Sequence, residues 1–139
     1  MTLEEIENSL PNGLHDAEVR ALLVDYERHN VTLQVSVWIG NMDDPPERRE
    51  AYKEAKLEIR EFSFVIMEPP DGEYPYARPG TLCVDGCDLR KNIPAKLLRS
   101  LPENHFFRSL WVNEWNAFVH IAARDASIEW VNNEAVTYR

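Results

Sequence analysis

The clearest pattern in the chain is an alternation of apolar and polar residues between positions 31 and 39. One phase holds Val31, Leu33, Val35, Val37 and Ile39. Successive side chains of a β-strand point to opposite faces, so this pattern predicts a strand with one buried face. We therefore expect Val35 and Val37 to be buried. Gln34 and Ser36 should face solvent.

The residues before this strand predict its antiparallel partner. Segment 17–26 is apolar on both faces from Leu22 to Val24, which is typical of a more central strand. Between the two segments, Asn30 tolerates the positive φ that a tight hairpin turn requires. We predict that segment 17–26 pairs with segment 31–39.

A further strand is predicted from about Lys53 to Met67, although residues 47–56 also have strong helix propensity. A helical first turn is the alternative, and the choice for 47–56 is left open. Apolar residues alternate through Ala55, Leu57 and Ile59, and then in the other phase through Phe62, Phe64 and Ile66. That change of phase requires a bulge or a turn after Arg60 and Glu61.

The remaining segments predict two short helices and more strands. Thr2 and Glu5 form a capping-box pattern that opens the first helix, and Pro94 and Pro102 bracket the second, at 93–101. Extended segments are expected at 81–84, 105–112, 117–123 and 127–131, with turns at 85–86, 113–116 and 124–126. Together these elements predict an α+β fold, a predominantly antiparallel β-sheet of about six or seven strands with two short helices.

Length and composition predict a single domain that spans residues 1–139. Hydrophobic residues make up 44% and charged residues 28% of the chain, as in ordinary globular proteins. No apolar run is long enough to cross a bilayer. The acidic start, Met1 to Glu5, lacks the positive region of a signal peptide, so the expected location is cytoplasmic.

The net charge of −9 bears on possible partners. Such a field repels nucleic-acid phosphates and anionic membranes, so neither is an expected partner, whereas a basic protein would be attracted. The alternative explanation of this charge is solubility alone. The loop carboxylates that could form an acidic face are Asp43, Asp44, Glu47, Asp71, Glu73 and Asp85.

A proline-rich loop, 68–80, is the other candidate for recognition. Four prolines exclude a helix or a central strand here. Its Tyr74, Tyr76 and Arg78 suit contact with a partner, or could simply pack the loop onto the sheet. The candidate partner-binding residues are therefore Asp43, Asp44, Asp71, Glu73, Tyr74, Tyr76 and Arg78.

No catalytic motif emerges from the sequence. His15 and Asp16 are adjacent, and on a strand they would point to opposite faces, which prevents them from forming a dyad. Cys83 and Cys87 lack the four-ligand pattern of structural zinc, and we expect free thiols. His15, His105, His120 and the cysteines show no metal-ligand spacing. We predict no catalytic residue, metal or cofactor.

Trp38, on the polar phase of its strand, is expected to be covered.

Two short motifs carry a resemblance to known proteins. The chain opens its first strand with Leu14-His15-Asp16-Ala17, and its last third contains Glu114-Trp115-Asn116-Ala117. In these features it resembles uncharacterised small bacterial β-rich proteins with an LHDA-type or LHDS-type opening strand. Some families of this appearance occur among immunity proteins of bacterial toxin systems. The resemblance implies an antiparallel sheet and a bacterial origin, and it brings no catalytic residues.

Two functional hypotheses follow. The first is a non-enzymatic interaction protein, immunity-like, that binds a basic partner through an acidic face. The alternative is a small-ligand-binding or hydrolytic enzyme with its site under loop 68–80, using His15, His105 or His120. A deep pocket with convergent histidines and carboxylates would favour the enzyme. The partner and the oligomeric state are left open.

Overall fold

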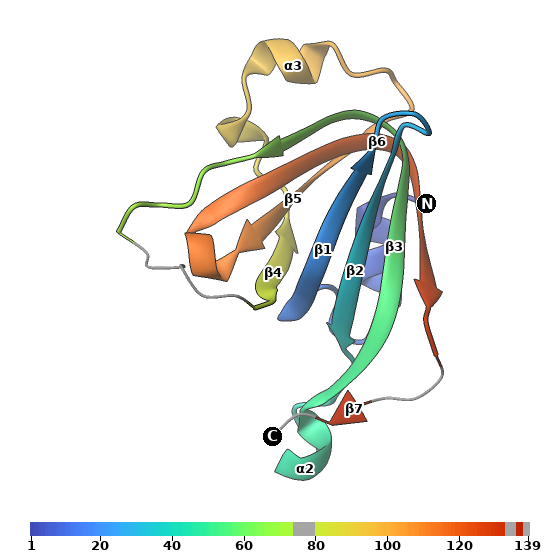
Figure 1. Cartoon of the computed structure of the whole chain (residues 1–139), viewed down its shortest axis with the longest axis vertical. Coiled ribbons are helices and arrows are strands. Elements are labelled where there is room, and N and C mark those ends of the chain that lie inside the picture. Colours follow the sequence, from blue (N-terminus) through green and yellow to red (C-terminus); the bar gives the residue numbers. More distant parts are fainter. Residues whose placement is uncertain (74–79, 133–135, 138–139) are drawn as a thin grey trace.

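The computed structural model describes residues 1–73, 80–132 and 136–137, which form seven strands and several short helices (Figure 1). In chain order the elements are α1 (Leu3–Ser9), β1 (Ala17–Asp25), β2 (Asn30–Trp38), α2 (Pro46–Arg49), β3 (Ala51–Met67), β4 (Leu82–Cys87), the 3-10 helix η1 (Arg90–Asn92), α3 (Ala95–Arg99), β5 (Phe106–Val112), the 3-10 helix η2 (Asn113–Trp115), β6 (Ala117–Trp130) and β7 (Val136–Thr137).

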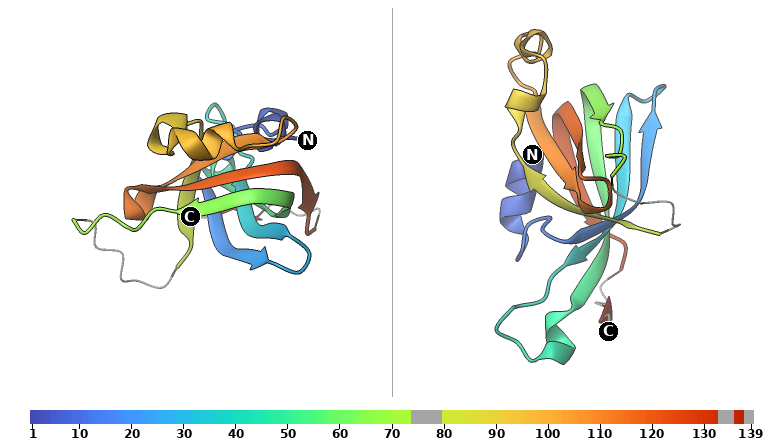
Figure 2. Two further views of the ribbon diagram at one scale, coloured as in Figure 1. Left: turned by 90° about the horizontal axis from the view of Figure 1, so that it is seen from above. Right: turned by 90° about the vertical axis from the view of Figure 1, so that its left-hand side faces the viewer.

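The strands form one antiparallel sheet that closes on itself. The order is β2-β1-β4-β5-β6-β3, and β3 pairs back with β2, so six strands make a closed barrel (Figures 1 and 2). β7 adds a short pairing at the start of β3. The prediction of a predominantly antiparallel fold is confirmed, and the two predicted short helices correspond to α1 and α3. Closure of the sheet was not predicted, and α2 corresponds to the helical turn given as the alternative for residues 47–56.

The hairpin of β1 and β2 pairs as predicted, from Glu18 opposite Ser36 to Asp25 opposite Asn30. The reason given for its turn was wrong. His29, with a φ of 60°, takes the left-handed conformation, and Asn30 already belongs to β2. The His29 ring stacks on Phe62 at 4.3 Å between ring centroids, which holds this side chain against the barrel.

β1 contains a bulge that explains its apolar residues on both faces. Its register with β2 shifts between Val19 and Ala21, so Arg20 is an extra residue. The bulge moves the inward-facing set from Val19 to Leu22. The interpretation of a central strand was therefore wrong for this half of β1, which pairs with β2 alone from Ala21 onward.

β3 settles the ambiguous segment. Residues 46–49 form α2, and the strand then runs continuously from Ala51 to Met67. The predicted irregularity is present, because Glu61 has a φ of 52° and the register with β6 shifts between Phe62 and Phe64. Phe62 faces the main core, whereas Phe64 packs outside the barrel in a smaller cluster with Phe107.

Two predicted turns are continuous strand. β4 runs through Asp85 and Gly86, and β6 runs through residues 124–126, of which Asp125 and Ala126 pair with β3. Gly86 is required in its strand because a Cβ there would lie 1.7 Å from a carboxylate oxygen of Glu7. The Asp-Gly pair, an ordinary turn signal, here leaves room for a side chain from α1.

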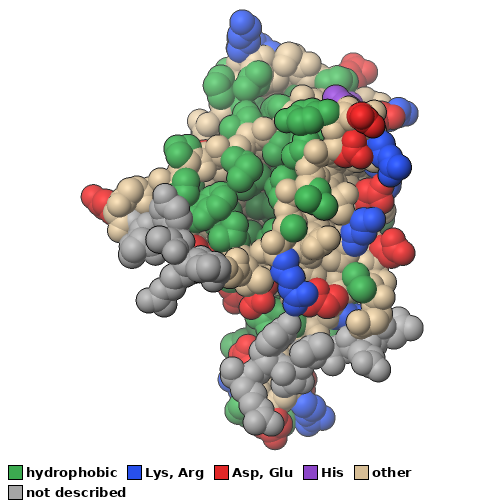
Figure 3. Space-filling model, viewed as in Figure 1, with side chains coloured by type: hydrophobic (Ala, Val, Ile, Leu, Met, Phe, Trp, Pro, Cys, Tyr) green, Lys and Arg blue, Asp and Glu red, His purple; other side chains and the backbone are tan. Residues whose placement is uncertain are grey.

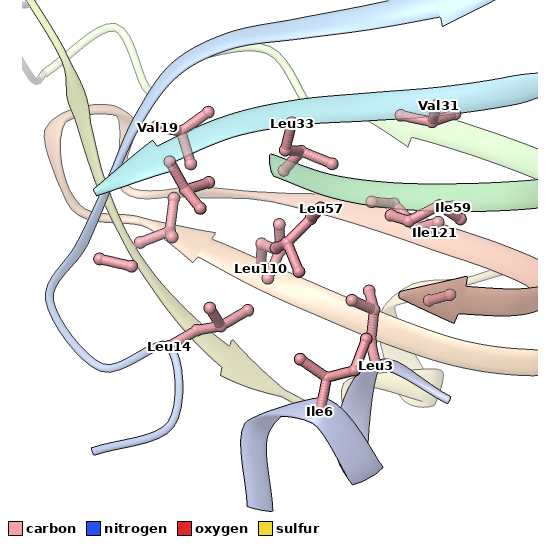
Figure 4. Packing of buried hydrophobic residues seen from close by; sticks show 14 of the residues in the cluster. Leu3, Ile6, Leu14, Val19, Val31, Leu33, Leu57, Ile59, Leu110 and Ile121 are labelled. Carbon is pink, nitrogen blue, oxygen red and sulfur yellow. The ribbon is translucent and has the colours of Figure 1, made fainter. Parts of the chain in front are cut away.

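α1 packs its apolar face against the inner side of the barrel. Leu3 and Ile6 are buried among strand residues such as Leu57 and Leu110 (Figure 4). The predicted capping box is present at Thr2 and Glu5.

From the same helix, the carboxylate of Glu7 accepts hydrogen bonds from Arg108 of β5 at 2.6 and 3.1 Å. Their side chains are 8% and 14% exposed, so this ion pair is shielded from solvent.

The outer face of β2 differs from the prediction at one residue. Val35 and Val37 are buried and Gln34 is exposed, as expected, but Ser36 is also fully buried. Ser36 Oγ donates a hydrogen bond to Glu54 and accepts one from Arg20 at 3.2 Å, so the hydroxyl is satisfied. Trp38 is covered, as predicted, and its Nε1 donates to the carbonyl of Arg49 at 2.7 Å.

Candidate ligand-binding site

An apolar pocket of about 440 Å³ opens into the barrel where β1 separates from β4. The two strands pair over only three residue pairs, from Ala17 opposite Val84 to Val19 opposite Leu82. Beyond them the side of the barrel is open, and Figure 3 shows hydrophobic side chains gathered around a hollow on this face. Its lining residues are Val19, Arg20, Ala21, Leu22, Leu33, Met67, Gly80, Leu82, Val84, Leu110, Val112, Trp115 and Val119.

The lining is almost entirely aliphatic. Trp115 is the aromatic residue of the set and Arg20 the charged one. The guanidinium of Arg20 is occupied, since it donates to Ser36 and to Glu54. Among the described residues that line this pocket, none is a histidine, cysteine or carboxylate. The pocket can therefore remove an apolar group from water, but it offers no acid–base pair.

The rim of the pocket is fixed by hydrogen bonds to η2 and the residue that follows it. The backbone N–H of Asp71 donates to the Trp115 carbonyl at 2.8 Å, and Asn116 Nδ2 donates to the Asp71 carboxylate at 3.1 Å. On the other side, the Cys83 N–H donates to both carboxylate oxygens of Glu114, at 2.8 and 3.0 Å. These bonds tie the chain after β3 and the start of β4 to one short helix.

Two pairs of the predicted acidic residues lie beyond opposite ends of the same strand. Asp43 and Asp44 precede α2 at one end of β3, and Asp71 and Glu73 follow the other end of that 17-residue strand (Figure 1). Asp71 is also engaged in the rim contacts. A role for either pair in binding a partner remains a prediction.

The other candidate residues of the proline-rich loop, Tyr74, Tyr76 and Arg78, lie outside the described residues.

His15 and Asp16 do meet, contrary to the prediction. They lie in a turn, and Asp16 has a φ of 56°, so the strand rule of opposite faces does not apply. His15 Nε2 lies 3.4 Å from Asp16 Oδ2, and His15 Nδ1 lies 3.2 Å from Asp85 Oδ2. The imidazole is thus bracketed by two carboxylates on the surface.

Cys83, beside this histidine, is a poor nucleophile. The thiol of Cys83 is partly buried and donates to Asp16 at 3.5 Å. Burial first, and then the charge of Asp16, raise the pKa of Cys83 to about 12. The reactive thiolate is therefore almost absent at neutral pH. Both cysteines are free in the structure.

A buried serine and histidine form a hydrogen-bonded row with a partly exposed glutamate, and sequence reasoning missed it. Ser109 Oγ and Glu68 Oε2 each lie 2.8 Å from His120, at Nδ1 and Nε2 respectively. The connectivity resembles a catalytic triad. However, Ser109 and His120 are fully buried, and the rings of Phe107 and Phe118 stack on the imidazole. No substrate reaches this serine, so we interpret the row as structural.

Nothing in the sequence linked these three residues. Ser109 and His120 are opposite one another in the β5–β6 register, and Glu68 follows the end of β3. Only the long-range pairing brings them together. His105, a further predicted candidate, hydrogen-bonds through Nδ1 to Ser63 on the surface. Within residues 1–73 and 80–132, no group of three or more histidines, cysteines and carboxylates is arranged to hold a metal ion.

A second hollow, of about 390 Å³, is polar and its charges are paired. It is lined by Arg60, Glu61, Asn104, Arg124 and Asp125. Arg60 contacts Asp125 at 2.7 Å, and Arg124 contacts Glu61 at 3.0 Å. Hydrogen bonds from the N-terminal ammonium and then from Arg60 lower the pKa of Asp125 to about 2. With its charges matched internally, this hollow presents no unbalanced group to a ligand.

The fold and site thus define a closed antiparallel barrel with an apolar opening between β1 and β4, and comparisons with known proteins add no function to that description. No family model matches the chain, and no curated protein matches it. Among solved structures it is similar to an uncharacterised protein from Neisseria gonorrhoeae, with 8% sequence identity and a TM-score of 0.43 over 83% of this chain and 91% of that one. None of the helices in the described residues has the length and apolar character needed to cross a membrane.

Proposed function

We propose that the protein is a non-enzymatic binding protein that takes an apolar group into the pocket between β1 and β4. The observation that carries this proposal is the 440 Å³ aliphatic opening, which has the size and the lining of a ligand site. Its position is close to that of the alternative hypothesis, because its lining includes Met67, which precedes loop 68–80, and Gly80, the last residue of that loop. The described residues of this lining include no histidine, cysteine or carboxylate for acid–base chemistry.

The chemistry of the other candidate groups supports binding over catalysis. The Cys83 thiol is held protonated, and Ser109 is inaccessible. A ligand group that loses about 200 Å² of apolar surface gains roughly 5 kcal/mol. Lost translational and rotational freedom offsets much of that gain, so we expect affinities for isolated small ligands in the micromolar to millimolar range.

The test uses a matched pair of substitutions on β1. Leu22 lines the pocket, whereas its neighbour Leu23 is 54% exposed and does not. The neutral fluorescent probe N-phenyl-1-naphthylamine should bind the native protein. Leu22→Asp should weaken that binding at least tenfold, and Leu23→Asp should change it less than twofold. A native protein that does not bind the probe, or equal effects of the two variants, would refute the proposal. Thermal melts verify that both variants fold.

A second proposal is the immunity-like interaction with a basic protein. Its support is the net charge of −9 and a group of carboxylates near the β1–β4 junction, in which Asp16, Glu18 and Glu114 surround Cys83. If this role holds, Asp16→Asn with Asp85→Asn should slow association with the product of an adjacent toxin-like gene. The effect should shrink at high salt because salt screens exposed charges. Association rates indifferent to both salt and substitution would contradict it.

A further inference from the structure

We infer that the apolar group held in the pocket belongs to an extended peptide of a partner protein, which adds to the free edge of β1 as a new strand. The inference rests on the proposed function and specifies its ligand. The peptide backbone would pair with β1, and every second side chain would enter the pocket.

The first support is the unpaired edge itself. β1 pairs with β2 from Glu18 to Asp25 apart from the bulge, but its other edge meets β4 only at Ala17, Glu18 and Val19. From Ala21 to Asp25 this second edge has no strand partner among the described residues. Backbone N–H and C=O groups on such an edge form a template for another strand.

The second support is that the edge and the pocket coincide. Ala21 and Leu22 belong to the unpaired stretch and also line the pocket. Side chains alternate between the faces of a strand, so a peptide along this edge would direct alternate residues inward, beside Leu22. The remaining residues would lie on the outer face, where Leu23 is exposed.

The third support is the lack of the usual protection at this edge. Proteins commonly blunt free edges with proline or lysine. β1 reads AEVRALLVD and contains neither. Its bulge lies at Arg20, before the unpaired stretch begins, and so leaves Ala21 to Asp25 regularly extended. A regular five-residue edge with an exposed leucine can pair with another chain, and a partner strand would cover it.

A second edge borders the same mouth. β3 pairs with β2 only as far as Arg60, yet it continues to Met67, which lines the pocket and is 53% exposed. A small apolar molecule could fill the pocket, but it would leave both strand edges to water. An extended peptide satisfies the backbone groups and the apolar lining together.

The charge of the protein specifies the peptide further. A chain with a net charge of −9 favours lysine or arginine at the outward positions and disfavours aspartate and glutamate. The expected ligand is therefore a segment of about five to eight residues, alternating between aliphatic residues and polar or basic ones.

The experiment uses the peptide acetyl-Lys-Val-Thr-Val-Thr-Val-Thr-Lys-amide and two matched peptides. In one, the amide nitrogens of the valines are methylated, and in the other, those of the threonines. N-methylation removes the donor that a strand edge requires while retaining the side chains. We expect the unmodified peptide to bind and at least one methylated peptide to bind tenfold more weakly or worse.

Amide exchange measured by NMR provides a second readout. In the free protein, alternate amides between Ala21 and Asp25 should exchange quickly, because they face the open edge. The unmodified peptide should slow these amides at least tenfold, whereas N-phenyl-1-naphthylamine should leave them unchanged.

Two outcomes separate this inference from the proposed function. If the naphthylamine probe binds but the unmodified peptide does not, or if all three peptides bind equally without protecting the β1 amides, strand addition is refuted and the pocket remains a small-ligand site. If neither the probe nor the peptide binds, the proposed function fails as well.

Discussion

We call the line along which two neighbouring strands pair a seam. Two seams of this barrel differ sharply in the number of residue pairs that join their strands. The β2–β3 seam joins nine residue pairs, from Asn30 opposite Arg60 to Trp38 opposite Tyr52. The β1–β4 seam joins three. Both are antiparallel and both border the main core, so strand type alone does not decide closure. The barrel is therefore closed by continuous strand pairing between β2 and β3 and is partly open between β1 and β4.

The physical origin of the difference lies in the apolar pattern. Along the β2–β3 seam, Val31, Leu33 and Val35 lie opposite inward-facing residues of β3 without interruption. β1 begins in register with β4 but changes phase at the Arg20 bulge, after which it pairs with β2 alone. The continuous seam supplies stability, and the interrupted one exposes the interior where a ligand can enter.

The largest expected effect comes from a charge placed in the closed seam. Val35 is 1% exposed, and Val35→Asp should cost about 4 kcal/mol because it buries an unpaired carboxylate. The adjacent Gln34 is exposed, and Gln34→Asp should cost less than about 1 kcal/mol. Urea unfolding measures both. Equal losses would mean that the two faces of β2 are not distinguished as described.

A comparison of leucines on the two seams tests the contrast directly. Leu57 is 1% exposed in the closed seam, and Leu57→Ala should lower the free energy of unfolding by about 3 kcal/mol. Leu22 is half-buried beside the open seam. Leu22→Ala should lower the free energy of unfolding by only about 1 kcal/mol, because this side chain already contacts solvent. Unfolding free energies of the two variants should therefore differ by about 2 kcal/mol. A larger loss at Leu22 would show that the open side is the more tightly packed one.

Glycine substitutions test how β4 is held on its other side. Gly86→Ala should cost about 2 kcal/mol, since the new methyl group meets the carboxylate that binds Arg108. Gly72, whose added Cβ would meet nothing within 4 Å, is the matched control, and Gly72→Ala should stay within about 0.5 kcal/mol. Thermal melts give the comparison. If Gly86→Ala were neutral, the contact with Glu7 would not constrain the strand.

The smallest effect is expected at alkaline pH, near the short β1–β4 seam. Burial raises the pKa of Cys83 from 9.0 to about 12 and that of Tyr52 from 10.0 to about 12. Each raised pKa favours the neutral form in the folded protein. The contribution of Cys83 to stability is therefore complete below pH 9 and is lost as the pH rises towards 12.

Between pH 9 and 10 the thiol is the first of the two groups to ionise in the unfolded chain. The free energy of unfolding should fall over this interval, and Cys83→Ala should reduce the fall. The measurement is the urea midpoint at intervals of half a pH unit. Identical slopes for the native protein and the variant would contradict the assignment.

Local pattern predicted the strands on both sides of each seam, but it did not predict the bulge in β1 or the short β1–β4 pairing. The alternation of β2 and the phase change in β3 could be predicted from the sequence because each pattern is contained within one strand. The β1 bulge was not, since Leu22 to Val24 fits both a bulge and a doubly buried strand. The pocket depends on which strands pair, and that information is not local.

The candidate chemistry shows the same division. The Glu7 contact that explains Gly86 and the position of Ser109 beside His120 both join residues distant in the chain. His15 and Asp16 were misjudged because the rule for strands was applied to a turn, where the positive φ of Asp16 brings the two side chains together.

The three-pair seam also has a consequence for the order in which the chain folds. The β1–β2 hairpin closes between Asp25 and Asn30, five positions apart, whereas the first pair of the β1–β4 seam joins Ala17 to Val84, 67 positions apart. Closing so long a loop costs conformational entropy, and the three residue pairs of this seam offset little of that cost. We expect the hairpin to form early and this seam to be among the last to close. The barrel interior would then stay accessible through most of the folding reaction. A nascent chain would therefore expose these apolar residues to aggregation longest at the opening that the native protein retains.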